Sequence, residues 1–311
     1  MILYQLEKNE EKYFQQLTGK SSSYFYLFDA ASSVVAGFTF AINGYIPMVL
    51  CFLCCITSTI ISFKFRHTVI VEEEVKPISL KEYYFQIKDS VKFFIKSDRI
   101  KLLILLNAVF LGLVTGIINL RSSMLTEIHV PEVYFGIVFA VLQVGAAIAS
   151  RYSEKIHKAF RNKTLTYLTL PVTVSCILVG FIGKDTLSKS SLILIVLLFL
   201  IQYAIKGPYR ALMSRYINNF TNRKIRPKLT ALSYLLSNLF TAGVSLTCSI
   251  LLGVTTTANT FIIVGCITTI FAVLILDYMR GRVGLKPEQY SKEDLKYSLY
   301  RPDLNKKKTS K

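Results

Sequence analysis

Eight long apolar runs, separated by polar segments, limit what this chain can fold into more than any other feature. The hydrocarbon core of a bilayer is about 30 Å thick, and about 20 mostly apolar helical residues cross it. Each run approaches that length. The runs cover approximately residues 26–43, 45–64, 101–121, 132–150, 164–183, 190–210, 229–252 and 258–277. We therefore expect an all-α membrane protein, a polytopic helical bundle of about eight transmembrane helices.

The charge of the chain agrees with membrane insertion. Of its 311 residues 52% are hydrophobic, yet the formal net charge is +18. A soluble protein this apolar could not also present enough polar surface to stay in solution. Insertion removes the conflict, because the apolar segments then face lipid and the basic residues gather in the loops.

The distribution of Lys and Arg among the loops predicts the orientation. On one side of the membrane the loops hold only three of the 37 basic residues, Arg121, Lys184 and Lys189. Loops rich in positive charge stay in the cytoplasm. We therefore expect a multi-pass protein of the cell membrane, compatible with a bacterial inner membrane, with both termini cytoplasmic.

The segment SRYSEKIHKAFRNK, residues 150–163, is a basic loop on the predicted cytoplasmic side, and it includes Arg151 and Arg161. Such a charge could indicate nucleic-acid binding. However, the cations of this chain are distributed over separate loops, without a soluble domain that organises them. We expect the lipid bilayer, and no nucleic acid, as a partner.

The sequence gives no sign of an enzyme. It contains no His-Glu-x-x-His, no Gly-x-Ser-x-Gly, no phosphate-binding loop and no cluster of paired carboxylates. Its three histidines, His67, His129 and His157, are scattered over both predicted sides of the membrane. The six cysteines lie inside apolar runs, as small apolar side chains do. We expect no catalytic activity, no metal site and no cofactor.

Strongly polar side chains are distributed unevenly among the spans. The apolar stretches of the second, fifth and eighth spans, residues 45–63, 164–182 and 261–276, contain no Asn, Gln or charged residue. Each of the others contains at least one, and such groups usually face a cavity or a neighbouring helix. A bundle whose every third helix lies outermost, around a central polar route, would produce this pattern.

Two loops carry a resemblance to the major facilitator superfamily of secondary transporters. Residues 150–163 resemble the family's basic cytoplasmic loop between helices eight and nine, although the aspartate and glycines of that motif are absent here. Residues 215–239, RYINNFTNRKIRPKLTALSYLLSNL, resemble the connection between helices ten and eleven in drug-exporter-like members. If the eight spans correspond to helices five to twelve, the lipophilic ones become six, nine and twelve, which are peripheral in the family.

This resemblance implies a domain organisation in which the family's first four helices are missing. The connector between the two halves would contain an amphipathic helix, because Leu80, Tyr84 and Ile87 recur at helical spacing. The expected parts are a cytoplasmic N-terminal segment, 1–24; a two-helix end of the first half-bundle, 25–65; a cytoplasmic amphipathic connector, 66–100; a six-helix second half-bundle, 101–279; and a basic cytoplasmic tail, 280–311.

The polar residues of the spans are the candidates for substrate contact. In the family, helices seven and ten line the cavity, so Asn107 and Gln202 come first. Gln143, Tyr234 and Asn238 would border the same route. Each of these five could equally form hydrogen bonds that hold helices together.

Four charged residues could act in gating or electrostatic attraction. Counting along its span places Arg121 near the outer face, where it would attract an anionic substrate or anchor the helix at the interface. Lys206 and Arg210 flank a Gly-Pro pair and could gate the cavity mouth, or extend to the inner headgroups. Asp29 is expected about one turn from the cytoplasmic end of its span, as a solvated cap or a partner for a nearby lysine.

Two functions remain open at this stage. The first is a secondary active transporter that moves a small solute by alternating access, exporter-like and in a truncated form, with a coupling ion such as H+. The second is a non-transporting membrane protein or remnant that needs a partner chain to complete its bundle.

Overall fold

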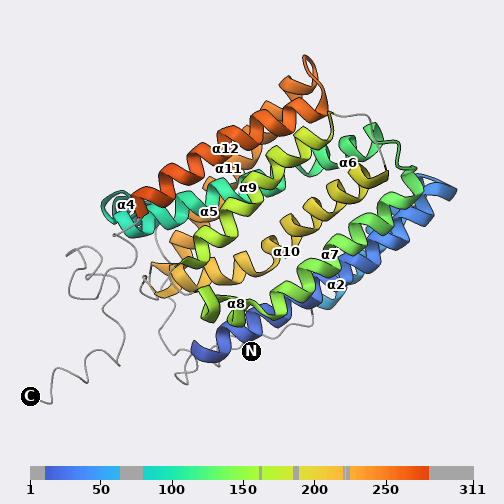
Figure 1. The fold of residues 1–311 in the computed structure, drawn as a ribbon. Helices are drawn as coiled ribbons and strands as arrows, with labels where there is room; N and C mark the ends of the chain where they lie inside the picture. Colours follow the sequence, from blue (N-terminus) through green and yellow to red (C-terminus); the bar gives the residue numbers. More distant parts are fainter. Residues whose placement is uncertain are drawn as a thin grey trace, which may run out of the picture.

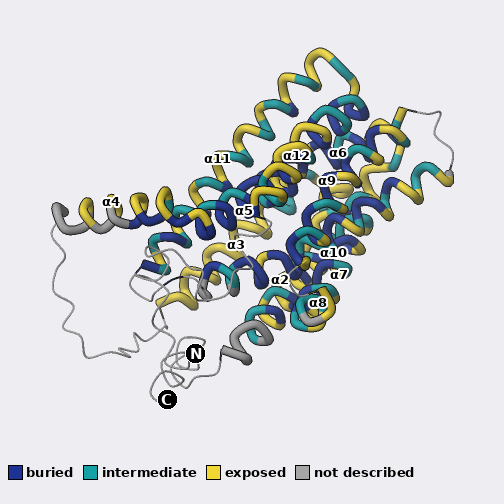
Figure 2. The backbone as a smooth tube through the Cα atoms, turned by 60° about the vertical axis from the view of Figure 1, so that its left-hand side comes forward, coloured by how far each residue is buried: buried dark blue, intermediate teal, exposed yellow. Residues whose placement is uncertain are grey.

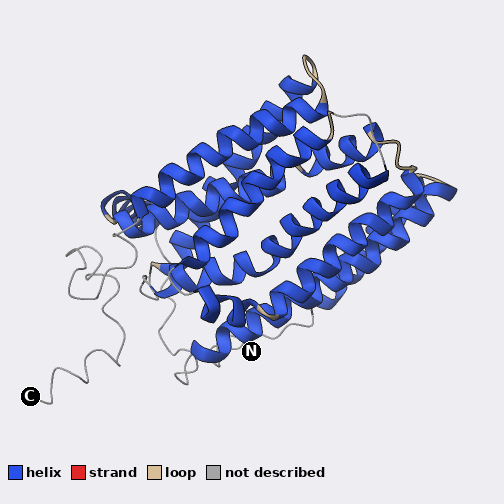
Figure 3. Cartoon of the chain, viewed as in Figure 1, coloured by secondary structure: helices blue, strands red, loops and turns tan. Residues whose placement is uncertain are grey.

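The computed structural model describes residues 11–63, 80–160, 163–184, 189–219, 221 and 225–279. In this part of the chain, eight segments are helical, long and apolar enough to cross a membrane. The elements are α2 (Glu11–Ile42), α3 (Tyr45–Ser62), α4 (Leu80–Lys96), α5 (Asp98–Gly116), α6 (Ile118–Glu127), the short 3-10 helix η1 (Glu132–Tyr134), α7 (Phe135–Arg151), α8 (Ser153–Phe160), α9 (Thr164–Ile182), α10 (Lys189–Asn219), α11 (Arg226–Leu252) and α12 (Thr257–Met279). The regular elements of the described residues are thus all helices (Figure 3), and eight apolar helices indicate a multi-pass membrane protein.

The spans run side by side and give the molecule two ends (Figure 1). The amphipathic helix α4 and the short helix α8 lie at one end, together with the starts of α2, α5 and α11. We call it the basic end, because it carries the loops predicted to be cytoplasmic. Within the basic segment, Ser153–Phe160 form α8 there, two residues after Arg151. Arg161, residues 1–10 and 64–79 and the tail from residue 280 lie outside the described residues.

The first span begins earlier than the apolar run suggested. Helix α2 already runs at Glu11, and its membrane-spanning part extends over Leu17–Ile42. Lys20 and three consecutive serines interrupt the hydrophobic pattern there, so the sequence alone placed the start near residue 26. This shift moves Asp29 to the middle of the span, and it corrects the expectation that Asp29 lies one turn from the end.

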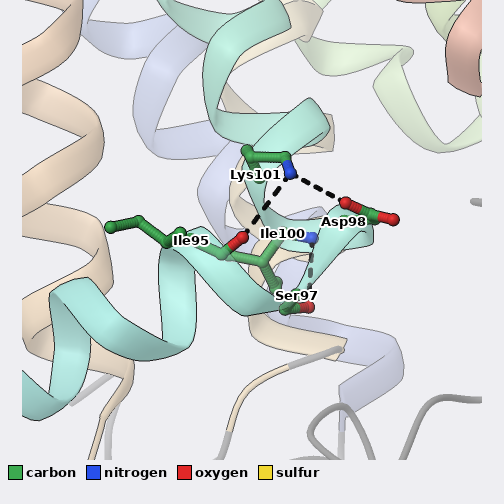
Figure 4. Close-up of polar contacts among 5 residues, drawn as sticks. All are labelled: Ile95, Ser97, Asp98, Ile100 and Lys101. Atoms are coloured by element: carbon green, nitrogen blue, oxygen red, sulfur yellow. Dashed lines mark hydrogen bonds and ion pairs between the residues drawn. The ribbon is translucent and has the colours of Figure 1, made fainter.

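The third span is broken into α5 and α6 at Ile117, and its start is well capped. The hydroxyl of Ser97 accepts a hydrogen bond from the Ile100 amide at 3.5 Å. Lys101 Nζ lies 2.8 Å from the Asp98 carboxylate and 3.5 Å from the Ile95 carbonyl (Figure 4). These contacts fix the corner between α4 and α5 at the basic end.

Close helix contacts occur where glycines remove side-chain bulk. A Cβ atom on Gly112 or Gly116 of α5 would come within 2.6 Å of Phe240 or Val244 of α11. On α7, a Cβ on Gly136 would come within 2.5 Å of the Ser33 carbonyl of α2. Small residues allow membrane helices to approach in this way. As a result α5 packs along α11, and α2 packs along α7 (Figure 1).

Burial differs sharply between the helices, as Figure 2 shows. Helix α5 lies at the centre of the hydrophobic core, with most of its side chains inaccessible. Helix α3, by contrast, contains no buried residue and contacts chiefly α2. Helices α9 and α12 lie between these extremes and pack against each other.

Candidate functional site

A cavity of about 380 Å³ lies between α2, α5, α10 and α11. Its α2 and α11 residues come from the first turns of the spans, and its α10 residues come from the last turns, so the cavity lies toward the basic end. The lining residues are Thr18, Ser21, Ser22, Phe25, Tyr26, Asn107, Leu111, Arg210, Met213, Ser214, Ile217, Thr230, Ser233 and Tyr234. Cavities of this size accommodate small organic molecules.

Asn107 contributes to the wall of the cavity from α5. Its side-chain amide donates a hydrogen bond to the Ser233 hydroxyl at 2.9 Å and another to the Ser237 hydroxyl at 3.4 Å. Both serines belong to α11. Asn107 therefore joins α5 to α11 and also lines the cavity, so the two roles considered for it coexist.

Arg210 of α10 and Tyr234 of α11 contact each other at the wall of the cavity. Arg210 Nη2 donates to the Tyr234 hydroxyl at 3.1 Å, and the guanidinium carbon lies 5.8 Å from the centre of the tyrosine ring. Both side chains are exposed rather than buried. This contact places one cation and one hydroxyl at the cavity wall.

Arg121 is the centre of a second polar group, which is fully enclosed. Its side chain has no exposed surface. Nε and Nη2 both donate to Oε1 of the Gln202 side chain, at 3.1 and 3.0 Å. Nη1 donates to the backbone carbonyl of Val114 at 3.3 Å. The Gln202 amide in turn donates to the Ser175 hydroxyl of α9 at 3.0 Å. We call Arg121, Gln202 and Ser175 the arginine cluster.

The burial of Arg121 corrects the expectation that this residue meets the outer surface. Counting residues along a straight helix placed Arg121 near the outer face. The structure breaks that helix at Ile117, and the side chain contacts the carbonyl of Val114, seven residues earlier in the chain. The Arg121 side chain has no exposed area. It therefore neither anchors the helix at the membrane interface nor attracts solutes from the outer surface.

Tyr203 links the arginine cluster to a second cation. The guanidinium carbon of Arg121 lies 4.9 Å from the centre of its ring, and Lys206 Nζ lies 5.3 Å from the same centre. Contacts of this length between a cation and an aromatic ring are favourable, most of all where water is excluded. Lys206 therefore has an aromatic contact within the bundle.

The polar residues of α10 lie on one face of that helix. Gln202, Lys206, Arg210 and Ser214 follow one another at intervals of four residues. The face begins in the arginine cluster and ends in the cavity. At 1.5 Å per residue, Gln202 lies about 12 Å from Arg210 along the helix axis. The sequence around Gly207 and Pro208 does not interrupt this face, because α10 continues through both residues.

Asp29 and Gln143 join α2 to α7 at the middle of the membrane. The Gln143 amide donates a short hydrogen bond to the Asp29 carboxylate, and Gln143 itself is 8% exposed. Asp29 thus has an internal amide partner, whereas the sequence predicted a solvated cap or a partner for a nearby lysine.

The remaining candidates lie elsewhere. Asn238 is exposed on α11 and does not line the cavity. Gln143 and Gln202 are buried and hydrogen-bonded to other side chains, and they do not line it either. Arg151 is exposed at the end of α7, beside α8.

Sequence reasoning missed several residues of both polar groups. Ser175 and Ser233 were overlooked because serine hydroxyls are common in membrane spans and were not counted as polar signals, and Tyr203 was not among the selected candidates. Tyr26 was also missed, and it lines the cavity. Spacing could have indicated Ser233 and Ser237, since they lie one helical turn apart.

Within the part of the chain that the structure describes, no three His, Cys, Asp or Glu side chains are placed to hold a metal ion. The chain matches no protein-family model and no curated protein sequence. The polar groups therefore have to be interpreted from their own geometry.

Proposed function

We propose that this protein is a secondary active transporter that moves a small solute by alternating access. In this proposal the protein belongs to the major facilitator superfamily and is exporter-like, and the eight spans correspond to the family's helices five to twelve. Its membrane is the cell membrane, as in a bacterial inner membrane, with both termini cytoplasmic. The observation that carries the proposal is the cavity at the basic end, whose wall is formed by four different spans.

The arrangement along α10 supports a route through the bundle. Arg210 and Ser214 line the cavity, and Gln202 lies deeper in the membrane, in the enclosed arginine cluster. A transporter in an inward-facing state has this asymmetry, with a cavity on one side and a packed barrier on the other. In the outward-facing state, Gln202 and Arg121 would become accessible while the spans around Arg210 and Tyr234 close over the cavity.

The contact between α2 and α7 is the place where such a change could occur. It combines close glycine packing at Gly136 with the hydrogen bond between Asp29 and Gln143. A carboxylate in the middle of a span is a candidate for coupling to a proton. We propose H+ as the coupling ion, with Asp29 as its acceptor.

Solute flux in proteoliposomes tests the proposal. Liposomes that contain the purified chain are loaded with a mixed metabolite extract, a proton gradient is imposed, and the internal solutes are measured by mass spectrometry. We expect the internal amount of at least one solute to change relative to protein-free liposomes, and a protonophore to abolish the change. If no solute moves while circular dichroism shows a folded protein, the transporter proposal fails.

A matched pair of variants locates the route. Ser214→Leu places a bulky side chain in the cavity, and Asn238→Leu makes a comparable change on the exposed face of α11. We expect Ser214→Leu to reduce flux at least about tenfold, since the solute then loses both space and a hydroxyl partner. Asn238→Leu should leave flux unchanged.

The exposure of α3 supports a second candidate function, a non-transporting membrane subunit that completes its bundle with a partner chain. No residue of α3 is buried, and only 17% of the most hydrophobic part of α11 is buried. In detergent solution, an unpartnered bundle of this kind should aggregate or lose its fold. A monodisperse, thermally stable monomer in light scattering would count against the subunit and in favour of the transporter.

A further inference from the structure

We propose that the cavity binds a small organic anion, with the carboxylate or phosphate group on Arg210 and the apolar part against Phe25 and Leu111. The inference names the substrate class of the proposed route and rests on the proposed function for that role. Binding itself can be tested without transport.

The charges around the cavity are the first reason. Among the described residues that line it, Arg210 is the only charged one, and none is Asp or Glu. One turn deeper on the same face of α10 lies Lys206, and beyond it lies Arg121. Within the described part of α2, Asp29 is the carboxylate inside the bundle, and it already accepts a hydrogen bond from Gln143.

None of the three cations is neutralised by an ion pair. Among the side chains that the structure describes, no carboxylate lies within ion-pair distance of Arg121, Lys206 or Arg210. Cations inside a membrane are costly, and the cost falls when an anion is bound nearby. An excess of positive charge therefore favours a negatively charged ligand and disfavours a cationic one.

Arg210 has the donors to hold such a ligand. A guanidinium group carries five N–H donors, and in this structure Arg210 uses one side-chain hydrogen bond, to the Tyr234 hydroxyl. The side chain is exposed to the cavity rather than enclosed. Its planar fork matches the two oxygens of a carboxylate or phosphate group. The Tyr234 contact fixes the direction of the fork before the ligand arrives.

The other residues of the cavity wall indicate the chemistry of the rest of the ligand. Hydroxyl groups from α2, α10 and α11 line the cavity, and a ligand with additional oxygen atoms would hydrogen-bond with them. The lining hydroxyls are those of Thr18, Ser21, Ser22, Tyr26, Ser214, Thr230, Ser233 and Tyr234. Phe25, Leu111, Met213 and Ile217 add apolar surface. A compact organic anion satisfies both kinds of wall.

An anion at Arg210 could come from a dissolved solute or from a lipid headgroup. Both carry the same acidic oxygens. We commit to the dissolved solute, because a phospholipid would bring its acyl chains toward a wall that is rich in hydroxyl groups, where they gain little.

The test uses three small molecules of nearly the same shape, benzoate, benzamide and benzamidinium, whose charges differ. The full chain is placed in nanodiscs of phosphatidylcholine, and its thermal unfolding is followed by circular dichroism at constant ionic strength. A ligand that binds the folded state raises the unfolding temperature with its concentration. We expect benzoate to raise it and the other two to leave it unchanged. Stabilisation by benzamidinium alone, or equal shifts with all three, would overturn the proposal.

Variants of Arg210 connect the effect to the cavity. Arg210→Gln should weaken the apparent affinity for benzoate about ten- to hundredfold, because a charge-assisted hydrogen bond is lost. Arg210→Lys should show a smaller loss, since it keeps the charge but not the fork. Arg151→Gln removes the same charge from the surface near the basic end and should bind as the unchanged chain does. Unaltered benzoate binding by both Arg210 variants would overturn the proposal.

A lipid arm separates the two sources of the anion. The same melts are run in nanodiscs that contain phosphatidylglycerol, without benzoate. If this lipid stabilises the chain in an Arg210-dependent manner and benzoate does not, the dissolved-solute proposal is overturned and the headgroup is the ligand. Benzoate binding without any solute flux in proteoliposomes would support the anion site and contradict only the transporter.

Discussion

Helices α3 and α5 are both long, apolar and able to cross a membrane, yet they occupy opposite environments. None of the most hydrophobic part of α3 is buried within the protein, against 72% of that of α5 (Figure 2). Lipid tails and protein interiors are similarly apolar, so hydropathy detects the membrane without distinguishing lipid from protein neighbours. What distinguishes α5 is Asn107 together with two glycines, Gly112 and Gly116, at its contact with α11.

The largest change in the free energy of unfolding is expected from a substitution in the buried arginine cluster. Gln202→Leu removes the oxygen that accepts two hydrogen bonds from Arg121 and leaves this cation enclosed. We expect a loss of about 3 kcal/mol in the free energy of unfolding, measured by SDS titration with circular dichroism. Leu53→Ala on α3 is the control and should change the free energy by less than about 0.5 kcal/mol. Equal effects would show that the enclosed cluster does not hold the bundle together.

A smaller effect is expected at the close glycine contact between α2 and α7, where no buried cation loses its partner. A Cβ on Gly136 would come within 2.5 Å of the Ser33 carbonyl, whereas a Cβ on Gly243 would meet nothing within 4 Å. Gly136→Ala should therefore separate α2 from α7 and lower the free energy of unfolding by about 1–3 kcal/mol. Gly243→Ala should be neutral or slightly stabilising, because alanine favours a helix. The same SDS titration measures both, and a tolerated alanine at Gly136 would mean that α2 is not packed against α7.

The reactivity of the native cysteines distinguishes exposed from buried positions without any substitution. Cys51, Cys54, Cys55 and Cys266 are exposed on the protein surface within spans, whereas Cys176 and Cys248 are buried. In liposomes a lipid-soluble maleimide should modify the first four and spare the other two, as read by mass spectrometry. A charged, water-soluble maleimide should modify none of the four, because lipid surrounds them. Rapid modification of Cys51 by the charged reagent would place α3 next to water.

The number of spans could be predicted from the sequence, because runs of apolar residues and the thickness of a bilayer determine it. The helical periodicity of the connector likewise indicated α4. Asn107, Tyr234 and Arg210 were selected as polar residues within spans, and they do line one cavity. These features could be predicted because they follow from the local sequence pattern.

The remaining features depend on tertiary packing. Arg121 was placed at the outer face because residue counting assumes a straight helix, while the break at Ile117 redirects its side chain. Ser175 lies in a span without amides or charges, and only the neighbouring α10 makes it part of the arginine cluster. No local pattern could indicate that Gln143 on α7 would meet Asp29 on α2, since 114 residues separate them.

The most direct test of alternating access is the two-sided accessibility of the cavity. Leu111→Cys places a thiol in the cavity wall on α5, in a background whose other exposed cysteines are replaced by alanine. A charged methanethiosulfonate reagent is applied to one side of sealed vesicles at a time, with a metabolite mixture on both sides. Alternating access predicts modification from the basic end and, more slowly, from the opposite end. Modification from one side only, at every reagent concentration, would contradict a transport route through this cavity.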